Sequence, residues 1–310
     1  MRIVFMGTAE FGLPGLRLLL ENKYEIVGVV TNADKPSGRG QKVTCSPVKE
    51  FAIERNLPLL QPLSLKDESF INQLTTLKAD VFVVVAFRIL PAAVFQIPKH
   101  GTFNLHASLL PQYRGAAPIQ WAIINGERET GVTTFFLDEK VDTGNIILQA
   151  RLPIRENETA GELHDRLAEI GGEIILHTVR LIELGSAPRR QQDNSVATPA
   201  PKIFKESCEI DWKRKAGDIH NFVRGLSPVP CAFTYHRGTM LRIFRTQLAD
   251  EHHKGNAGEV LKSDKRFLIA TGTGVVELIE VQQQGKKKLR AEEFLRGYRI
   301  TEGEILGTTA

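Results

Sequence analysis

RIVFMGTAEFG, residues 2–12, joins a β-prone apolar run to a turn that is bounded by two glycines. Leu13, Leu16 and Leu20 follow at helical spacing, and the apolar run 26–30 comes after them. A strand, a turn, a helix and a second strand in this order are typical of the start of a doubly wound sheet. The sequence therefore predicts an α/β fold whose sheet is mostly parallel.

The same alternation continues further along the chain. Residues 81–86 are apolar throughout, as a central parallel strand that is buried on both faces should be. Residues 103–106 read as another short strand, and helical patterns occur around 51–55, at 69–77 and at 161–184. We expect these elements to form a first domain, residues 1–187.

Residues 188–206 are polar and contain several prolines, so we interpret them as a linker between domains. Short β-like runs separated by glycine-bearing turns follow, and they predict a smaller C-terminal domain, 207–310, that is a closed β-barrel. Five runs support this prediction: 232–235, 240–244, 258–261, 267–270 and 275–281.

Composition is that of an ordinary globular protein. Of 310 residues, 42% are apolar and 25% are charged, and the length favours two domains. The longest apolar run, 81–87, is too short to cross a bilayer, and the N-terminal residues lack the layout of a signal peptide. We therefore expect a cytoplasmic protein, and no long apolar stripe requires it to be other than a monomer.

Charge is unevenly distributed. Residues 202–310 contain 19 Lys and Arg against 14 Asp and Glu, whereas residues 1–201 contain 21 against 22. The whole positive excess lies in the second domain, which hints at a polyanionic partner, although charge alone slightly favours a lysine-rich solvated surface.

The strongest candidates for catalytic side chains lie in the middle of the chain. Asn104 and His106 are two residues apart on a predicted strand, so they point to one side of it. Asp142 follows in a polar turn before the apolar run 146–148. An amide and an imidazole can hold a developing oxyanion, and a carboxylate can orient the imidazole and help to move protons. The alternative is a satisfied polar network at the end of a strand.

Other chemistries have little support. The turn at 7–12 is not G-x-G-x-x-G, and Ser108 lacks the G-x-S-x-G setting of a nucleophile. The three cysteines are few, odd in number and far apart, so we expect neither a disulfide framework nor a zinc site. His252 and His253 lie in a polar turn, where solvent exposure is the simpler interpretation, and we expect no metal.

Two basic segments are candidates for binding nucleic acid. Residues 34–49 are long, glycine-rich and basic, and they leave a predicted parallel strand at its carboxyl end, where such sheets bind ligands. Arg39 and Lys42 in this segment could contact a phosphate backbone. Lys286, Lys287 and Lys288 form the second segment. In both cases a solvated surface segment is the alternative.

Residues 104–147 resemble the signature region of the folate-dependent formyltransferases. Two segments resemble the branch of this family that acts on an aminoacyl-tRNA: residues 32–42 with 46–49, and residues 108–119 running on to 125–126 and 130–133. The resemblance covers nearly the whole chain. It implies a Rossmann-like formyltransferase domain and an OB-like C-terminal barrel that binds tRNA.

The resemblance also implies the reaction. The donor would be 10-formyltetrahydrofolate, the acceptor would be the amino group of methionyl initiator tRNA, and no metal would be needed. Asn104, His106 and Asp142 match the catalytic residues of the family. The folate-binding segment matches Ser108, Leu109, Leu110 and Pro111, and Arg39 matches an arginine that reaches the acceptor end of the tRNA.

One departure from the family pattern is Arg88. It lies in a turn that is one residue shorter than in many relatives, which have a tyrosine and a glycine there. In the family this turn helps to form the pterin pocket.

Two rivals remain. A formyltransferase acting on a sugar-nucleotide amine shares the catalytic trio, but the basic loop and the positive second domain argue against it. A folate- or RNA-binding protein without catalysis has no need of Asn104, His106 and Asp142 together.

The basic loop yields a testable prediction. Arg39→Ala should weaken the use of tRNA with little effect on folate binding, because a lost phosphate contact removes a salt-dependent part of the affinity. Steady-state formylation across a salt series measures this. Equal activity of the variant and the unaltered protein at every salt concentration would contradict the prediction.

Overall fold

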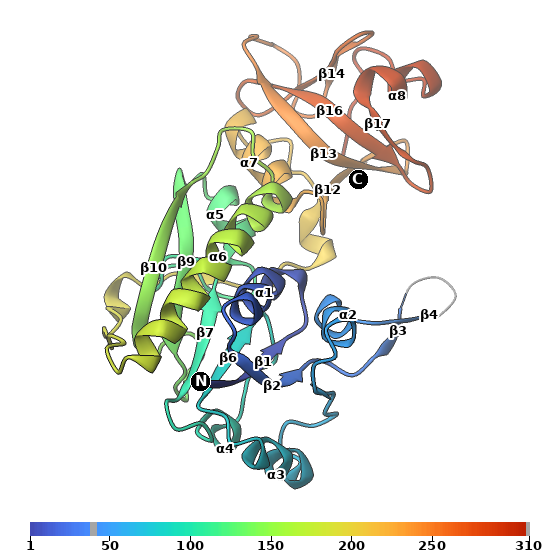
Figure 1. Ribbon diagram of the computed structural model, residues 1–310. Helices are drawn as coiled ribbons and strands as arrows, with labels where there is room; N and C mark the ends of the chain where they lie inside the picture. Colours follow the sequence, from blue (N-terminus) through green and yellow to red (C-terminus); the bar gives the residue numbers. More distant parts are fainter. Residues whose placement is uncertain (38–41, 308–310) are drawn as a thin grey trace. The chain divides into compact units, whose positions relative to one another are not determined.

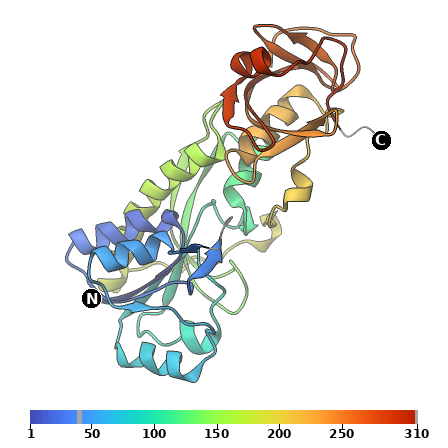
Figure 2. The same cartoon turned by 90° about the vertical axis from the view of Figure 1, so that its right-hand side faces the viewer.

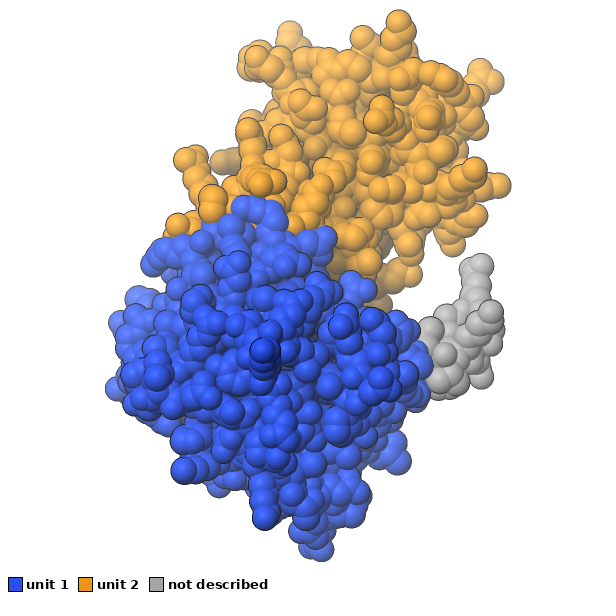
Figure 3. Space-filling view, viewed as in Figure 1, with its two compact units in different colours: residues 1–115, 130–152, 164–199 blue, residues 116–129, 153–163, 200–310 orange. Residues whose placement is uncertain are grey.

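The computed structural model describes residues 1–37 and 42–307, and it divides into two compact units (Figure 3). Unit 1 comprises residues 1–115, 130–152 and 164–199, and unit 2 comprises residues 116–129, 153–163 and 200–310. Residues 188–199, part of the predicted linker, thus belong to unit 1. The domain boundaries at 187 and 207 remain a prediction.

Unit 1 contains a seven-stranded sheet in the order β10-β9-β7-β6-β1-β2-β5 (Figure 1). The pairs among β6, β1, β2, β5 and β7 are parallel, whereas β9 runs antiparallel to β7. This arrangement confirms the predicted mostly parallel sheet. The seven strands are β1 (Arg2–Gly7), β2 (Glu25–Val30), β5 (Leu59–Leu60), β6 (Val81–Val85), β7 (Thr102–His106), β9 (Glu129–Phe136) and β10 (Ile146–Pro153).

Helices cover both faces of this sheet. On one face, alternate residues of β1 and β6 such as Met6 and Phe82 form a core with Phe70 and Phe95. Phe82 is fully buried, and burial of a side chain of this size contributes about 1.5–3 kcal/mol. The opposite face packs against α1 and α6. The helices are α1 (Leu13–Glu21), α2 (Pro47–Glu54), α3 (Glu68–Thr76), α4 (Ala92–Phe95) and α6 (Ala160–Glu183).

Two adjacent glycines let α6 approach the sheet closely. A Cβ atom built on Gly171 would lie 2.7 Å from Cδ2 of Leu105 in β7. One built on Gly172 would lie 2.9 Å from the backbone C of Pro14 and 3.0 Å from the backbone N of Gly15 in α1. Real Cβ atoms do not approach backbone so closely, so glycine at these positions lets α6 pack directly on β7 and α1.

The remaining elements of unit 1 are short. β3 (Lys35–Ser37) and β4 (Lys42–Thr44) form a two-stranded antiparallel ribbon within the basic segment that was predicted as a loop. β8 (Arg114–Gly115) pairs with β11 (Pro199–Ala200), and a 3-10 turn spans Asn194–Val196.

Unit 2 is built on a six-stranded antiparallel sheet. Its order is β12-β13-β16-β15-β14, with β17 paired to β16. Each of the five predicted β-like runs overlaps one of these strands, which confirms that the second domain is built on β-structure. The strands are β12 (Ala232–His236), β13 (Thr239–Ala249), β14 (Val260–Ser263), β15 (Phe267–Ala270), β16 (Val275–Gln283) and β17 (Lys288–Arg290).

Three helices belong to this unit: α5 (Pro118–Ile124), α7 (Ala216–Leu226) and α8 (Ala291–Gly297). Ile219 and Val223 of α7 and Phe294 of α8 are buried in one apolar core with the strands. The side chain of Arg224 donates to the carbonyl oxygens of Arg155 and Glu158, at 3.3 and 3.1 Å, which fixes residues 153–163 to α7.

The C-terminal segment joins the two edges of this curled sheet (Figure 2). Gly303 donates a backbone hydrogen bond to Val260 of β14, Leu306 donates one to Gly258 just before this strand, and Gly307 donates one to Tyr235 in β12. The segment therefore satisfies backbone groups of both edge strands, which would otherwise be open to pairing with another chain.

The glycine packing in unit 1 can be tested. Gly172→Ala should lower the free energy of unfolding by about 1–3 kcal/mol, because the added methyl group meets backbone atoms that cannot move aside. Gly217→Ala in α7 is the matched control, since a Cβ there meets nothing within 4 Å, and it should be neutral or stabilising by up to about 1 kcal/mol. Denaturant unfolding measures both, and equal effects would contradict the packing argument.

Candidate active site

β7 places Asn104 and His106 at the carboxyl edge of the sheet. The strand lies between β6 and β9, and Leu105 faces Gly171 of α6. Strand alternation therefore turns Asn104 and His106 away from α6, to the other side of the strand. Ligands of open α/β sheets bind at this edge.

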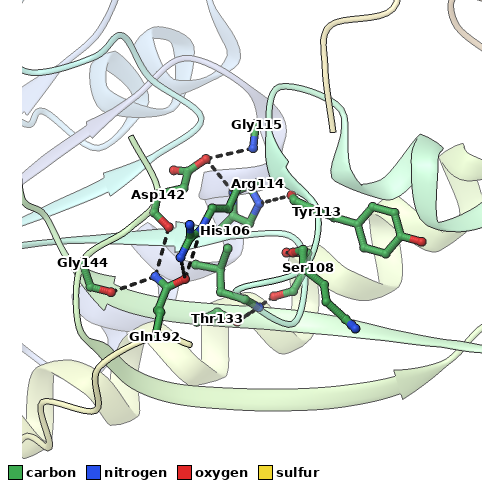
Figure 4. Close-up of polar contacts among 11 residues, drawn as sticks. His106, Ser108, Tyr113, Arg114, Gly115, Thr133, Asp142, Gly144 and Gln192 are labelled. Atoms are coloured by element: carbon green, nitrogen blue, oxygen red, sulfur yellow. Dashed lines mark hydrogen bonds and ion pairs between the residues drawn. The ribbon is translucent and has the colours of Figure 1, made fainter. Parts of the chain in front are cut away.

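The orientation of the His106 ring is set by a backbone carbonyl. Nε2 of His106 lies 2.8 Å from the carbonyl oxygen of Tyr113, and the side chain is 7% exposed (Figure 4). A carbonyl oxygen only accepts, so Nε2 carries hydrogen and donates it. The other ring nitrogen, Nδ1, is therefore the one available for proton transfer or for an oxyanion.

Asp142 lies opposite Nδ1. Its Oδ2 is 3.9 Å from Nδ1 of His106 and accepts a 3.0 Å hydrogen bond from the backbone N–H of Gly115. The distance to His106 is too long for a hydrogen bond but short enough for strong electrostatic attraction. The carboxylate can stabilise a charged imidazole while the hydrogen-bonding direction of Nδ1 stays open to a substrate.

Asn104 completes the trio. Its side chain is half-buried, and its amide makes no hydrogen bond to any other residue within 1–37 and 42–307. Both the amide oxygen and the amide nitrogen are thus free to bind a ligand. The three predicted residues come from one strand and one turn, and the structure brings His106 and Asp142 together as expected.

The segment Ser108–Pro111 follows β7 directly. Ser108 is fully buried, its hydroxyl donates to the carbonyl oxygen of Gln112 at 2.6 Å, and its carbonyl accepts from the hydroxyl of Thr133. Leu110 is 3% exposed, and its N–H donates to the same Thr133 oxygen. Leu109 and Pro111 are half-buried. The hydroxyl and carbonyl groups of Ser108 thus bond to other residues of the chain. This segment can therefore contribute to a site through its shape rather than through the Ser108 side chain.

The predicted phosphate contacts are only partly covered by the structure. Arg39 lies outside the described residues, and Lys42 is the first residue of β4, where its backbone pairs with Ser37. In unit 2, Lys286 and Lys287 are exposed, whereas Nζ of Lys288 is 2.9 Å from Oε2 of Glu280.

Arg88 braces the turn that follows β6. Its guanidinium donates to the carbonyl oxygens of Pro62 and Leu63, at 2.9 and 3.1 Å, and lies over the ring of Phe87. Burial lowers the pKa of Arg88. Arg88, the residue that departs from the family pattern, thus links the turn after β6 to the turn after β5.

Sequence reasoning missed three residues that hold His106 and Asp142. Tyr113 supplies the carbonyl that orients His106, Gly115 supplies an N–H to Asp142, and Gln192 bonds to the carbonyl of Asp142. Tyr113 and Asp142 have positive φ angles, +60° and +56°, which non-glycine residues rarely adopt. Backbone groups leave no signal in the residue types, so only the fold shows them.

The described residues give no support to a metal centre or to a reactive cysteine. Among the residues that the structure covers, no three His, Cys, Asp or Glu side chains gather as metal ligands would. Burial raises the pKa of the Cys208 thiol and raises that of Cys231 to about 12, which disfavours a reactive thiolate. Within the same residues, no helix is both long and apolar enough to cross a bilayer.

Comparison with known protein families gives two matches. A family model described as formyl transferase matches residues 1–179, and one described as formyl transferase, C-terminal domain, matches residues 202–299. Proteins named methionyl-tRNA formyltransferase are similar over nearly the whole chain. That of Bacteroides thetaiotaomicron is 47% identical over 98% of this chain and 97% of its own. That of Flavobacterium johnsoniae is 48% identical over 96% of each.

Solved structures share the fold at lower identity. A methionyl-tRNA formyltransferase from Clostridium thermocellum has a TM-score of 0.58 and 19% identity, covering 81% of this chain and 95% of that one. HypX from Aquifex aeolicus in complex with tetrahydrofolic acid has a TM-score of 0.67 and 21% identity. The match covers 98% of this chain and 50% of that one. An N-formyltransferase from Helicobacter canadensis, in complex with folinic acid and dTDP-3-aminofucose, has a TM-score of 0.69 and 24% identity. The match covers 89% of this chain and 98% of that one.

Proposed function

The chain belongs to the formyl transferase family, and on that premise we propose that it transfers the formyl group of 10-formyltetrahydrofolate to the amino group of methionyl initiator tRNA. The observation that carries the chemistry is the placement of His106, with Nε2 bonded to the Tyr113 carbonyl and Nδ1 facing Asp142. The acceptor is supported by relatives of 47% and 48% identity that are named methionyl-tRNA formyltransferase.

The residues at the edge of β7 fit a formyl donor. The half-buried amide of Asn104, without a partner among the residues described, can donate to a formyl oxygen. Ser108, Leu109, Leu110 and Pro111 lie directly beyond β7, and we propose that this segment holds the folate. The folate derivative supplies an already activated one-carbon group, so the protein has to bind, orient and move protons.

The proposed mechanism is direct attack by the amine. The methionyl amino group, as free base, attacks the formyl carbon, and negative charge develops on the formyl oxygen. Asn104 and the protonated Nδ1 of His106 donate hydrogen bonds to this oxygen, in a site where such donors act with little competition from water. The tetrahedral intermediate then loses the folate nitrogen, which must receive a proton.

Asp142 has two tasks in this mechanism. At 3.9 Å from Nδ1, its carboxylate is close enough to attract positive charge on the imidazole ring while that ring donates to the oxyanion. It can also pass a proton through water from the attacking amine to the departing nitrogen. The 3.0 Å bond from Gly115 N–H keeps the carboxylate in place without consuming Oδ1.

We propose that tRNA is held by Arg39 and Lys42 of the basic segment and by the second domain, 207–310. The excess of positive charge in residues 202–310 would attract the phosphate backbone. Exposed Lys286 and Lys287 are the best candidates in unit 2, because Lys288 already pairs with Glu280. We further expect a monomer in the cytoplasm.

A sugar-nucleotide amine is the second candidate acceptor, since solved sugar formyltransferases share this fold. Their identities of 24% support the fold and say nothing of the acceptor. Formylation of charged initiator tRNA measured beside formylation of an amino-sugar nucleotide, with the same donor, decides between the two. Activity on the sugar alone would overturn the proposed acceptor.

His106→Ala should lower kcat about 10²–10³-fold while folate binding largely survives, because the lost donor acts mainly on the oxyanion of the transition state. Steady-state kinetics with both substrates varied, together with folate binding by fluorescence, measure the two effects. His177→Ala on the exposed side of α6 is the matched control and should leave both unchanged. A rise in KM at constant kcat would show that His106 only binds substrate.

Lys286→Ala combined with Lys287→Ala should weaken tRNA binding without changing the folate KM. A plot of the logarithm of the tRNA association constant against the logarithm of salt concentration should have a slope smaller in magnitude by about 2. Each lysine that contacts a phosphate contributes about 1 to this slope. Arg17→Ala with Lys99→Ala removes two exposed positive charges from unit 1 and serves as the control. An unchanged slope would exclude these lysines from the tRNA interface.

A further inference from the structure

The segment 190–198, predicted as part of a linker, runs alongside the active site within unit 1. Arg190 and Ile146 exchange two backbone hydrogen bonds, of 2.8 and 3.0 Å. Thr198 accepts from the backbone N–H of Tyr113 through its hydroxyl and from that of Arg114 through its carbonyl, both at 2.9 Å. This segment is therefore bonded to the loop at 113–115 and to the start of β10, which follows the loop at 142–144.

Gln192 lies at the centre of the segment and uses both ends of its amide. Its Nε2 donates to the carbonyl oxygens of Asp142 and Gly144, at 3.0 and 2.8 Å (Figure 4). Its Oε1 accepts from Nε and Nη2 of Arg114, at 3.2 and 2.7 Å. The side chain is 5% exposed, and all four hydrogen bonds that an amide group can make are formed.

The backbone that Gln192 holds is an unusual one. Asp142 has φ +56°, a left-handed conformation that costs a non-glycine residue of order 1 kcal/mol and persists only where the surroundings fix it. Two residues on, a Cβ atom at Gly144 would lie 1.7 Å from the carbonyl oxygen of Phe136, so this turn also packs tightly on β9. The carbonyl groups of the turn point at Gln192, which leaves the Asp142 carboxylate directed at His106.

We propose that Gln192 is a positioning residue for formyl transfer, which acts by holding Asp142 opposite Nδ1 of His106. Arg114 is its anchor, because the guanidinium fixes Oε1 and thereby aims Nε2 at the turn. Gly115, next to Arg114, donates to the carboxylate of the same Asp142. Asp142 is thus held at its carbonyl and at its carboxylate by one connected set of hydrogen bonds. This inference rests on the proposed function.

The first test is Gln192→Glu, which keeps the shape of the side chain and its acceptor for Arg114. The second carboxylate oxygen would replace the two donated hydrogen bonds with repulsion from two carbonyl oxygens, and Arg114 would keep the carboxylate ionised. We expect kcat to fall about 10²-fold, as for a displacement of a reacting group by about 1 Å, with both KM values little changed. An unchanged kcat would overturn the proposal.

Two further variants serve as controls. Asn194→Ala removes a 2.8 Å bond to the same Arg114 from an exposed side chain, and it should leave kcat unchanged. Gln192→Met removes the donors without adding charge and should lower kcat to a similar extent as Gln192→Glu. A full loss of kcat in Asn194→Ala would mean that the segment as a whole is needed and that Gln192 has no particular role.

A double-mutant cycle separates positioning from general stability. If Gln192 acts through Asp142, then Gln192→Glu should cost almost nothing further in an Asp142→Asn background. A loss of the same size in both backgrounds would overturn the proposal, because a merely structural role does not depend on the Asp142 carboxylate. Thermal unfolding of each variant confirms that the measured protein is folded.

A measurement without substrate keeps this inference distinct from the proposed function. The ring resonances of His106 in the NMR spectrum should shift in Asp142→Asn, in Gln192→Glu and in Gln192→Met, and they should stay in place in Asn194→Ala. Unchanged ring resonances in both Gln192 variants would overturn the inference. Failure of the unaltered protein to formylate methionyl-tRNA would overturn the proposed function instead.

Discussion

The contact of α6 with β7 is the constraint on which the rest of unit 1 depends. Gly171 has no side chain, so Leu105 packs directly beneath the helix, and the pleat of the strand then turns Asn104 and His106 the other way. A slip of one residue in β7 would bury the side chains of Asn104 and His106 under α6 and expose Leu105. The packing of the core and the direction of the site are therefore fixed by the same contact.

Around this strand, the site is assembled largely from backbone groups. The carbonyl of Tyr113 determines which nitrogen of His106 is free, and the N–H of Gly115 places the carboxylate of Asp142. Positive φ angles at Tyr113 and Asp142 turn these groups inward. Strained backbone of this kind persists when the surroundings over-determine it, and segment 190–198 supplies those surroundings.

Much of this could be predicted from the sequence. Apolar runs such as 81–85 and glycine-bearing turns predicted β1, β2, β6 and β7 of the first sheet and five strands of the second, because periodicity and turn residues are local signals. The strands β5, β9 and β10 of the first sheet were not predicted. The short β17 was missed, since its three residues are mostly charged. The polarity of residues 188–199 predicts a linker, yet these residues belong to unit 1. Gln192 is buried among them, and its side-chain amide makes all four of its hydrogen bonds. Polarity predicts exposure only when no buried partner is available.

The sequence by itself determined the family and the mostly parallel sheet, and it predicted the trio of Asn104, His106 and Asp142. It could do so because these depend on residue types and on spacings of a few positions. The tertiary structure decided which nitrogen of His106 faces Asp142, that Arg88 braces the turn after β6, and that Gln192 supports Asp142 from 50 residues away. These relations join backbone and side-chain atoms across long sequence separations, so no local pattern contains them.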